Sequence, residues 1–277
     1  MLMQIVQAVC RMRRVMVTRA SDAGTNQSVE RAVSVLRALD AGRAELRVSD
    51  VAELTGLGSS TTSRLLSTLE RLDMVERDPV SNLYRLSLGI LPLAATAANR
   101  HPVHRAARMV LQDLATRTGL GANVAVRRGT ELMFLCNFEG TRAPKSYTQA
   151  GHTAPLHATS IGKCLLAGLS PKERRKLLPE PLAAHTDFTT TSHDLLDAEI
   201  DTVRRTGYAI EAEERALGRA SLAAPVRDAS GDVVAAISLW GPASLLGHHA
   251  DGEGQRPELV REVIEAADAI SQALGAL

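Results

Sequence analysis

The sequence has few aromatic side chains, few cysteines and no excess of charge of either sign. Phe, Trp and Tyr make up 3% of the 277 residues, so stacking on unpaired bases is a poor candidate for the main activity. Cys10, Cys136 and Cys164 form no CxxC or CxxH cluster, which argues against a disulfide scaffold or a structural zinc site and favours a reducing cytoplasm. The net charge of +1 neither demands nor excludes nucleic acid, because a basic face can be local.

Long hydrophobic runs are also missing. No apolar run approaches the roughly 20 residues that span a bilayer, so we expect a cytoplasmic protein with no membrane partner. Residues 1–26 open with a short apolar run that precedes a basic cluster, the reverse order of a secretory signal. We interpret them as a flexible basic tail or as the product of a start codon placed too early. An arm that reaches DNA is the alternative.

Residues 27–87 have the layout of a winged helix-turn-helix. The first predicted helix is capped by Ser28 and ends before Gly42, and a second, shorter helix is capped by Ser49. Two short strand-like pieces around an Asp-Pro turn then predict a hairpin. The expected buried side of the first helix recurs at helical spacing: Val29, Ala32, Val33, Leu36 and Leu39.

The third predicted helix begins with short hydroxylated side chains. Its expected buried side comprises Leu65, Leu66, Leu69 and Leu72, and Thr62 shares their stripe. Capping explains one hydroxyl at the helix start, whereas the others can donate to phosphates or bases. The predicted DNA contacts of this helix are Ser59, Ser60, Thr61, Ser63 and Arg64. In the hairpin, Arg77 and Arg85 are the next candidates, with solvated surface arginines as the alternative.

The rest of the chain predicts a linker followed by a larger domain. Residues 88–101 are apolar and alanine-rich and predict a linker helix, with Pro92 tolerated in its first turn. Residues 102–277 mix helices and strands, so the fold class is mixed α/β with two domains. The predicted helices are 103–118, 160–169, 194–206 and 257–274. The predicted strands are 123–128, 131–140, 145–150, 208–213, 221–228 and 232–240, and a hairpin-type turn joins the last two.

Several segments resemble the isocitrate lyase regulator (IclR) family of bacterial transcription factors, from about Gln27 to the C-terminus. They are QSVERAVSVLRAL, VAELTGLGSSTTSRLLSTLE, MVERDPVSNLYRLSLGI, APLHATSIGKCLLA and GYAIEAEERALGRASLAAPVRDASGDVVAAISLWGP. The resemblance implies a winged helix that binds double-stranded operator DNA, a linker helix, and a C-terminal α+β GAF-like domain. That domain would bind a small organic-acid effector and form a homodimer or a tetramer, as a dimer of dimers. The regulator would repress or activate a catabolic operon.

The resemblance also implies the residues of the effector pocket. It places Ser160 and Ile161 at the start of a helix, Glu211 on one strand, and Ser221 and Ser238 on two later strands. Hydroxyls and a helix N-terminus can hold a carboxylate in an apolar cavity. Glu211 suits an anionic ligand only if it accepts from a ligand hydroxyl or is itself protonated.

Two residues depart from the family pattern. Trp240 stands where a small polar residue is common, and it shares a strand face with Ser238. It can narrow the cavity or stack on a flat ligand, with plain core packing as the alternative. Arg219 stands where an apolar residue is common and can pair with an effector carboxylate; the alternative is an exposed or Glu-paired arginine. We therefore expect an aromatic or otherwise bulky carboxylic acid.

The competing prediction is a small-molecule-binding enzyme whose N-terminal helices are incidental. Lys163 could lower the pKa of the neighbouring Cys164 thiol. However, no orienting base is identifiable, and a cysteine inside an apolar helix is usually packed in the core. The sequence has no Gly-rich phosphate loop and no recognisable carboxylate pair. We therefore expect no catalysis, no cofactor and no metal.

Overall fold

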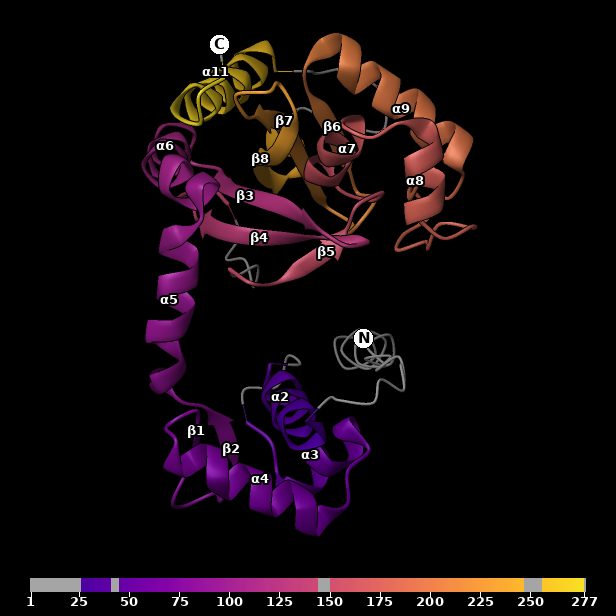
Figure 1. Ribbon diagram of the computed structural model, residues 1–277. Helices are drawn as coiled ribbons and strands as arrows, with labels where there is room; N and C mark the ends of the chain where they lie inside the picture. Colours follow the sequence, from indigo (N-terminus) through magenta and orange to yellow (C-terminus); the bar gives the residue numbers. More distant parts are fainter. Residues whose placement is uncertain (1–25, 41–44, 144–149, 247–255, 277) are drawn as a thin grey trace. The chain divides into compact units, whose positions relative to one another are not determined.

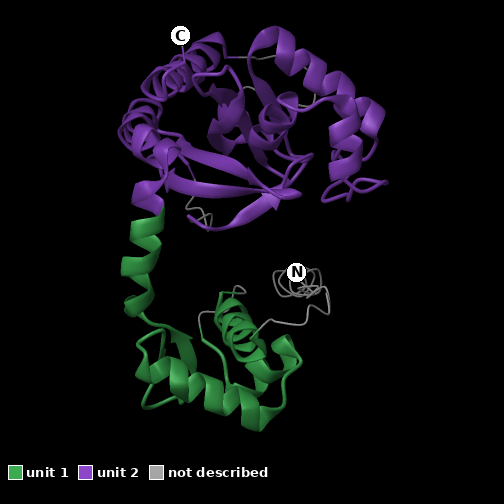
Figure 2. Cartoon of the chain, viewed as in Figure 1, with its two compact units in different colours: residues 1–97 green, residues 98–277 purple. Residues whose placement is uncertain are grey.

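A computed structural model of the chain describes residues 26–40, 45–143, 150–246 and 256–276. Contacts divide the chain into two compact units, residues 1–97 and 98–277 (Figure 2). The predicted tail, apart from its last residue, lies outside the described residues, as do Cys10 and most of the predicted strand at 145–150. Each unit has an apolar core of its own.

The described part of the first unit begins with three helices and a hairpin (Figure 1). The helices are α2 (Gln27–Leu39), α3 (Val48–Thr55) and α4 (Ser59–Arg71). The hairpin pairs β1 (Val75–Arg77) with β2 (Tyr84–Leu86) in antiparallel register. This arrangement confirms the predicted helix-turn-helix with a small wing. The central core residues are Val35, Leu39, Leu46, Val51, Leu66, Leu69, Val75 and Tyr84.

The buried helix faces differ in part from the predicted ones. Val29 and Val33 are 58% and 38% exposed, whereas Val35 and Ala38 are buried. The apolar stripe of α2 is wide enough to fit two orientations, and packing against α3 and α4 selects one of them. Leu72 is 61% exposed because α4 ends one residue before it. These predicted core positions were therefore wrong.

Each predicted helix cap, Ser28 or Ser49, is instead the second residue of its helix. The N-cap of α2 is Asn26, whose side-chain oxygen accepts from the N–H of Ser28 at 3.2 Å. The N-cap of α3 is Arg47 instead of Ser49, and the Asp50 carboxylate accepts from the Arg47 N–H at 3.1 Å. Each helix thus starts earlier, because another side chain already satisfies its terminal N–H groups.

A short 3-10 turn (Leu88–Ile90) and α5 (Leu91–Arg100) follow the wing. The Ser87 hydroxyl donates to the Asp73 carboxylate and accepts from the N–H of Gly89 at 3.1 Å. A Cβ added at Gly89 would lie 2.0 Å from the backbone oxygen of Asp73. The start of the linker is therefore held against Asp73, just after the end of α4, by a contact that leaves no room for a side chain.

The second unit is built on a six-stranded sheet in which every neighbouring pair is antiparallel (Figure 1). Across the sheet the order is β5 (Thr153–Pro155), β4 (Glu131–Phe138), β3 (Gly121–Arg128), β8 (Val233–Pro242), β7 (Arg219–Arg227) and β6 (Ala209–Ala212). This confirms the predicted α+β domain, including the hairpin between its last two strands.

Helices cover both faces of this sheet. On one face, α6 (Pro102–Thr118) and α11 (Pro257–Ala273) pack on a cluster that includes Leu222 and Ile237. On the other face, α7 (Ser160–Ala167) and α9 (His193–Thr206) pack around Ala223 and Ala236. The four predicted helices are confirmed and differ only at their ends. The elements that were not predicted are β5, α8 (Pro171–Leu177) and α10 (Ala243–Leu246), which are too short for a periodic pattern.

Within the described ranges, no helix combines the length and apolar character that crossing a bilayer requires.

Candidate functional sites

The first candidate site is the solvent side of α4. Its N-cap is Gly58, with extended backbone and no side-chain cap, so no hydroxyl of the first turn is used for capping. The side chain of Thr62 is fully buried, and its hydroxyl donates to the Gly58 carbonyl at 3.2 Å, which confirms its predicted core position. The residues that remain at the surface or half-buried are Ser59, Ser60, Thr61, Ser63 and Arg64.

Arg64 is the cation among these five residues. Its side chain makes no hydrogen bond or ion pair with any residue in the described part of the chain. The N-terminus of α4 carries the positive end of the helix dipole. The exposed hydroxyls, this guanidinium and the helix terminus together offer hydrogen-bond donors to an anionic surface.

The two predicted arginines of the wing differ in their partners. Arg85 bonds to Glu45 at 2.8 Å and to its cross-strand neighbour Glu76 at 2.5 Å. Hydrogen bonds to Glu76 and Glu45 raise the pKa of Arg85. The guanidinium carbon of Arg77 lies 5.7 Å from the centroid of the Tyr84 ring, and the residue remains exposed. Arg77 therefore has donors available for a phosphate, while Arg85 must first leave two carboxylates.

The second candidate site lies on the sheet face that α7 covers. Directly paired residues of neighbouring antiparallel strands share a face. The register pairs Ser221 with Glu211 on one side and with Trp240 on the other. Ser238, two residues before Trp240, pairs with Asn123. The sheet therefore gathers four of the predicted pocket residues on one face.

Three predicted pocket residues form a chain of hydrogen bonds. The hydroxyl oxygens of Ser160 and Ser221 are 2.7 Å apart, and Ser221 donates to Glu211 Oε2 at 3.0 Å. Glu211 Oε1 accepts from the N–H groups of Glu214 at 2.8 Å and Arg215 at 3.2 Å. Burial raises the pKa of Glu211, although these donors oppose the effect. The carboxylate is thus fully hydrogen-bonded within the protein.

Two further pocket candidates, Ile161 and Ser238, are buried. Ile161 is 3% exposed and belongs to the apolar cluster beneath α7, so it does not join the polar group. The Ser238 hydroxyl donates to Asn123 Oδ1 at 2.8 Å. Asn123 was not predicted, although a lone polar residue within the apolar stretch GANVAV is a signal that could have found it.

Arg219 and Trp240 lie together on this face. The guanidinium carbon of Arg219 is 5.6 Å from the Trp240 ring centroid, within the range of a cation–π contact. The indole N–H donates to Asn137 Oδ1 at 3.2 Å, and a Cβ added at Gly121 would lie 2.0 Å from the ring. No described residue forms a hydrogen bond or an ion pair with the Arg219 side chain, whose contact is the face of the indole ring.

A buried ion group, missed from the sequence, lies beside this chain of hydrogen bonds. Lys163 is 2% exposed; its ammonium lies 2.7 Å from Glu199 and also pairs with Glu214. Burial alone would lower the pKa of Lys163, but the charges of Glu214 and Glu199 outweigh it and raise that pKa. Burial also raises the pKa of Glu214. The expected buried packing of Cys164 is confirmed, since its side chain is fully enclosed and burial raises its pKa.

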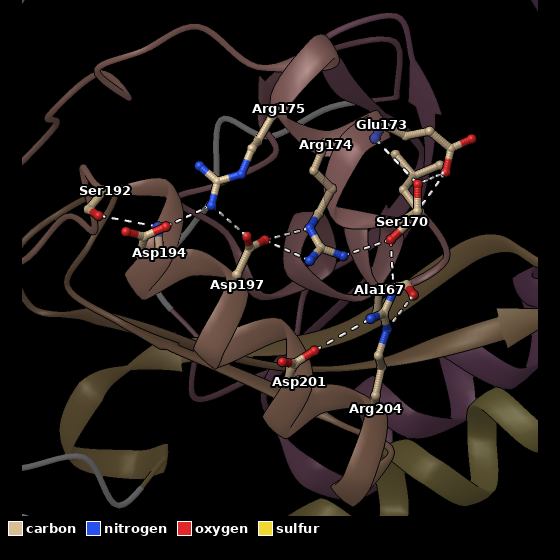
Figure 3. A network of polar contacts seen from close by, with 11 residues as sticks. Ala167, Ser170, Glu173, Arg174, Arg175, Ser192, Asp194, Asp197, Asp201 and Arg204 are labelled. Carbon is tan, nitrogen blue, oxygen red and sulfur yellow. Dashed lines mark hydrogen bonds and ion pairs between the residues drawn. The ribbon is translucent and has the colours of Figure 1, made fainter.

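Arginines hold the opposite end of α7 (Figure 3). Arg204 donates to the carbonyls of Ala167 at 3.0 Å and Leu169 at 2.7 Å. Arg174 donates to the same Leu169 carbonyl at 2.7 Å and contacts Asp197 at 2.6 and 2.8 Å. Because Ser160 is the first residue of α7, these contacts help to fix its position on the sheet.

The described residues include no group of three or more His, Cys, Asp and Glu side chains placed to hold a metal ion.

Two family models match the chain. The IclR helix-turn-helix domain matches residues 28–79, and the bacterial transcriptional regulator IclR C-terminal domain matches residues 95–272. The glycerol operon regulatory protein of Streptomyces coelicolor is 33% identical over 251 residues, which cover 90% of this chain and 97% of that protein. The transcriptional regulator XynR of Escherichia coli is 31% identical over 250 residues, with the same coverage.

Solved structures are similar over the same span. An IclR transcriptional regulator from Alicyclobacillus acidocaldarius has a TM-score of 0.77 at 27% identity, covering 91% of this chain and 100% of that one. An IclR homologue from Microbacterium hydrocarbonoxydans, complexed with 4-hydroxybenzoate, has a TM-score of 0.77 at 25% identity, covering 89% and 98%.

Proposed function

The chain belongs to the IclR family of bacterial transcriptional regulators, and from this premise we propose that it controls a catabolic operon in response to an aromatic or otherwise bulky carboxylic acid. It is a DNA-binding transcriptional regulator with an effector-binding domain. Members of the family are regulators and not enzymes, so the alternative of an enzyme with incidental helices was wrong. The proposed place of action is the cytoplasm, where operator DNA lies.

The proposed division of labour follows the predicted boundaries. Residues 27–87 bind DNA, residues 88–101 form the linker, and residues 102–277 bind the effector and associate with further copies. The linker takes part in this association: Leu88, Leu91 and Leu93 are 80%, 60% and 63% exposed, and a second copy that covered them would remove this apolar surface from water. Sedimentation equilibrium of the full chain tests this association; a monomer at micromolar concentration contradicts it.

We propose that α4 reads the operator with Ser59, Ser60, Thr61, Ser63 and Arg64. The observation that carries this proposal is the division of α4 into a buried stripe and a polar side that uses no hydroxyl as a cap. In a helix-turn-helix the second helix enters the major groove with its N-terminal residues at the bases. Arg77 and then Arg85 supply contacts from the wing, the latter with a smaller contribution because Glu45 and Glu76 already hold it.

Replacing Arg64 with alanine should weaken operator binding by roughly 10- to 100-fold, the range for one well-placed base contact of about 1–3 kcal/mol. The matched control is Ser67→Ala, on the same helix and also exposed, for which a change below about twofold is expected. A gel-shift titration with the protein's upstream intergenic DNA measures both. Equal and negligible effects contradict the proposed base-facing side, and binding without a steep salt dependence contradicts operator recognition.

The proposed effector class rests on Arg219 and Trp240. A guanidinium without a carboxylate partner can pair bidentately with a ligand carboxylate, and the neighbouring indole offers a flat apolar wall. The solved relative from Microbacterium holds 4-hydroxybenzoate, a ligand that combines a ring with a carboxylate. An aromatic carboxylic acid fits this pair of side chains better than a small aliphatic acid does.

Titration of the full chain with benzoate derivatives should change the fluorescence of Trp240, the only tryptophan in the sequence. Arg219→Gln should weaken binding by roughly 10- to 100-fold, since a hydrogen-bonded charge contributes about 1.5–3 kcal/mol. The control is Arg227→Gln, at the other end of β7, which should leave the affinity unchanged. If small aliphatic acids bind and aromatic acids do not, the proposed effector class is wrong.

A further inference from the structure

The hydrogen bonds that connect Ser160, Ser221 and Glu211 have a fixed direction. At the 3.0 Å contact Ser221 donates to Glu211 Oε2, which is the direction required when the carboxylate is ionised and only accepts. A serine has a single hydroxyl proton. At the 2.7 Å contact between the two hydroxyls, Ser160 must therefore be the donor. Both protons are thus committed to contacts inside the protein.

At Ser221 the protein can still accept a hydrogen bond from a ligand. The Ser221 oxygen gives one hydrogen bond and receives one, which leaves one lone pair. Ser221 is half-buried, whereas Ser160 is 1% exposed, so Ser221 is the more accessible of the two. Among the side chains of Ser160, Ser221 and Glu211, a ligand carboxylate would meet acceptors and no uncommitted donor. A ligand hydroxyl would find an acceptor.

Hydrogen-bond donors lie two residues away from Ser221 on the same strand face, at Arg219. Arg219 has only hydrogen-bond donors, and alternate residues of a strand share one face at a spacing of roughly 7 Å. Trp240 is the cross-strand partner of Ser221 and stacks with Arg219. The face therefore has a donor end and an acceptor end, with an aromatic wall next to both.

We propose that the effector carries a hydrogen-bond-donating hydroxyl as well as a carboxylate, with the carboxylate on Arg219 and the hydroxyl donating to Ser221. This inference rests on the proposed function and narrows its effector class to hydroxylated aromatic acids. The two groups stand on opposite sides of the ring, because the two ends of the site are roughly 7 Å apart. Glu211 is then a positioning residue that sets the direction of the hydrogen bonds.

Glu211→Gln reverses that direction at constant side-chain size. The amide oxygen still accepts from the N–H groups of Glu214 and Arg215, while the amide nitrogen, in the place of Oε2, donates to Ser221. The Ser221 proton is thereby released and can be donated to a ligand. Ser221 then donates a hydrogen bond to the ligand instead of accepting one from it.

The probes are 4-hydroxybenzoate and 4-methoxybenzoate, titrated against the full chain by Trp240 fluorescence. The wild type should bind the hydroxy acid about tenfold more tightly than its methyl ether, the effect of one hydrogen bond and a misplaced acceptor. In Glu211→Gln that ratio should fall to one or below. Ser221→Ala should abolish the discrimination, and it decides the question if Glu211→Gln does not fold. The control is Ser271→Ala on α11, which packs on the other face of the sheet; the Ser271 hydroxyl donates to the Ala267 carbonyl at 2.7 Å, and its loss should leave the ratio unchanged.

The outcomes separate this inference from the proposed function. If neither acid binds the wild type, the aromatic effector class itself fails. If both acids bind with equal affinity, or the wild type prefers the ether, the assigned direction is wrong while the proposed function stands. Retention of the wild-type ratio in Glu211→Gln and in Ser221→Ala overturns the role given to these two residues.

Discussion

Replacing Arg174 with methionine should lower the free energy of unfolding of the effector-binding unit by about 3 kcal/mol, the lower end of the range for breaking a buried ion pair. Arg174 is 1% exposed and makes its contacts with Asp197 and the Leu169 carbonyl from inside the protein. Methionine keeps an apolar side chain of comparable length but no donors. Asp197 loses its main partner, and because its side chain is 20% exposed, water relieves part of the penalty.

The matched control is the next residue along α8. Arg175 pairs with Asp194 at 2.7 Å and with Asp197 at 3.2 Å, but its side chain is 45% exposed, so Arg175→Met should cost less than about 1 kcal/mol. Urea denaturation followed by Trp240 fluorescence reports on this unit, because Trp240 lies in its sheet. Equal losses for the two variants, or no loss for Arg174→Met, would show that burial does not distinguish these arginines.

The helix α4, which we propose reads the operator, is the part of the molecule that local pattern predicts best. Thr62, Leu66 and Leu69 recur at helical spacing, and all three are buried. The same reasoning misplaced Val29 and Val33, since the orientation of a helix with a wide apolar stripe is decided by its neighbours in space. Periodicity therefore predicts that a helix has a buried side, and tertiary contacts decide its exact limits.

Less of the proposed effector site could be predicted from the sequence. The candidate residues came from family resemblance, and nothing in the pattern indicated that the Glu211 carboxylate would accept from two backbone N–H groups. Lys163 and Glu214 are separated by 51 positions in the sequence, and Arg174 and Asp197 by 23, so spacing rules for a single helix do not apply to them. A lysine in the apolar helix SIGKCLLA is nevertheless a local signal, because a buried cation requires a partner.

Lys163→Met should destabilise the effector-binding unit by about 3–5 kcal/mol at pH 8, because it leaves Glu214 buried without a cation. The loss should be smaller at pH 5. Burial already raises the pKa of Glu214, and removing the ammonium raises it further. As the pH is lowered from 8 to 5, the carboxyl therefore binds a proton more readily, and the penalty for a buried charge decreases. A folded-state pKa above the unfolded one means that stability falls as pH rises.

A double variant separates loss of the pair from loss of the lysine itself. Lys163→Met with Glu214→Leu replaces the central ion pair by apolar side chains, which is often neutral or stabilising. The side chain of Glu199 is 37% exposed and keeps its hydrogen bond from the Thr190 hydroxyl. The double variant should therefore recover most of the stability at pH 8 and lose the added pH dependence. The exposed Lys172→Met on α8 serves as the control for removal of a lysine. If the single variant shows no pH dependence, or the double variant is no more stable than the single one, the cost does not arise from an unpaired Glu214 carboxylate.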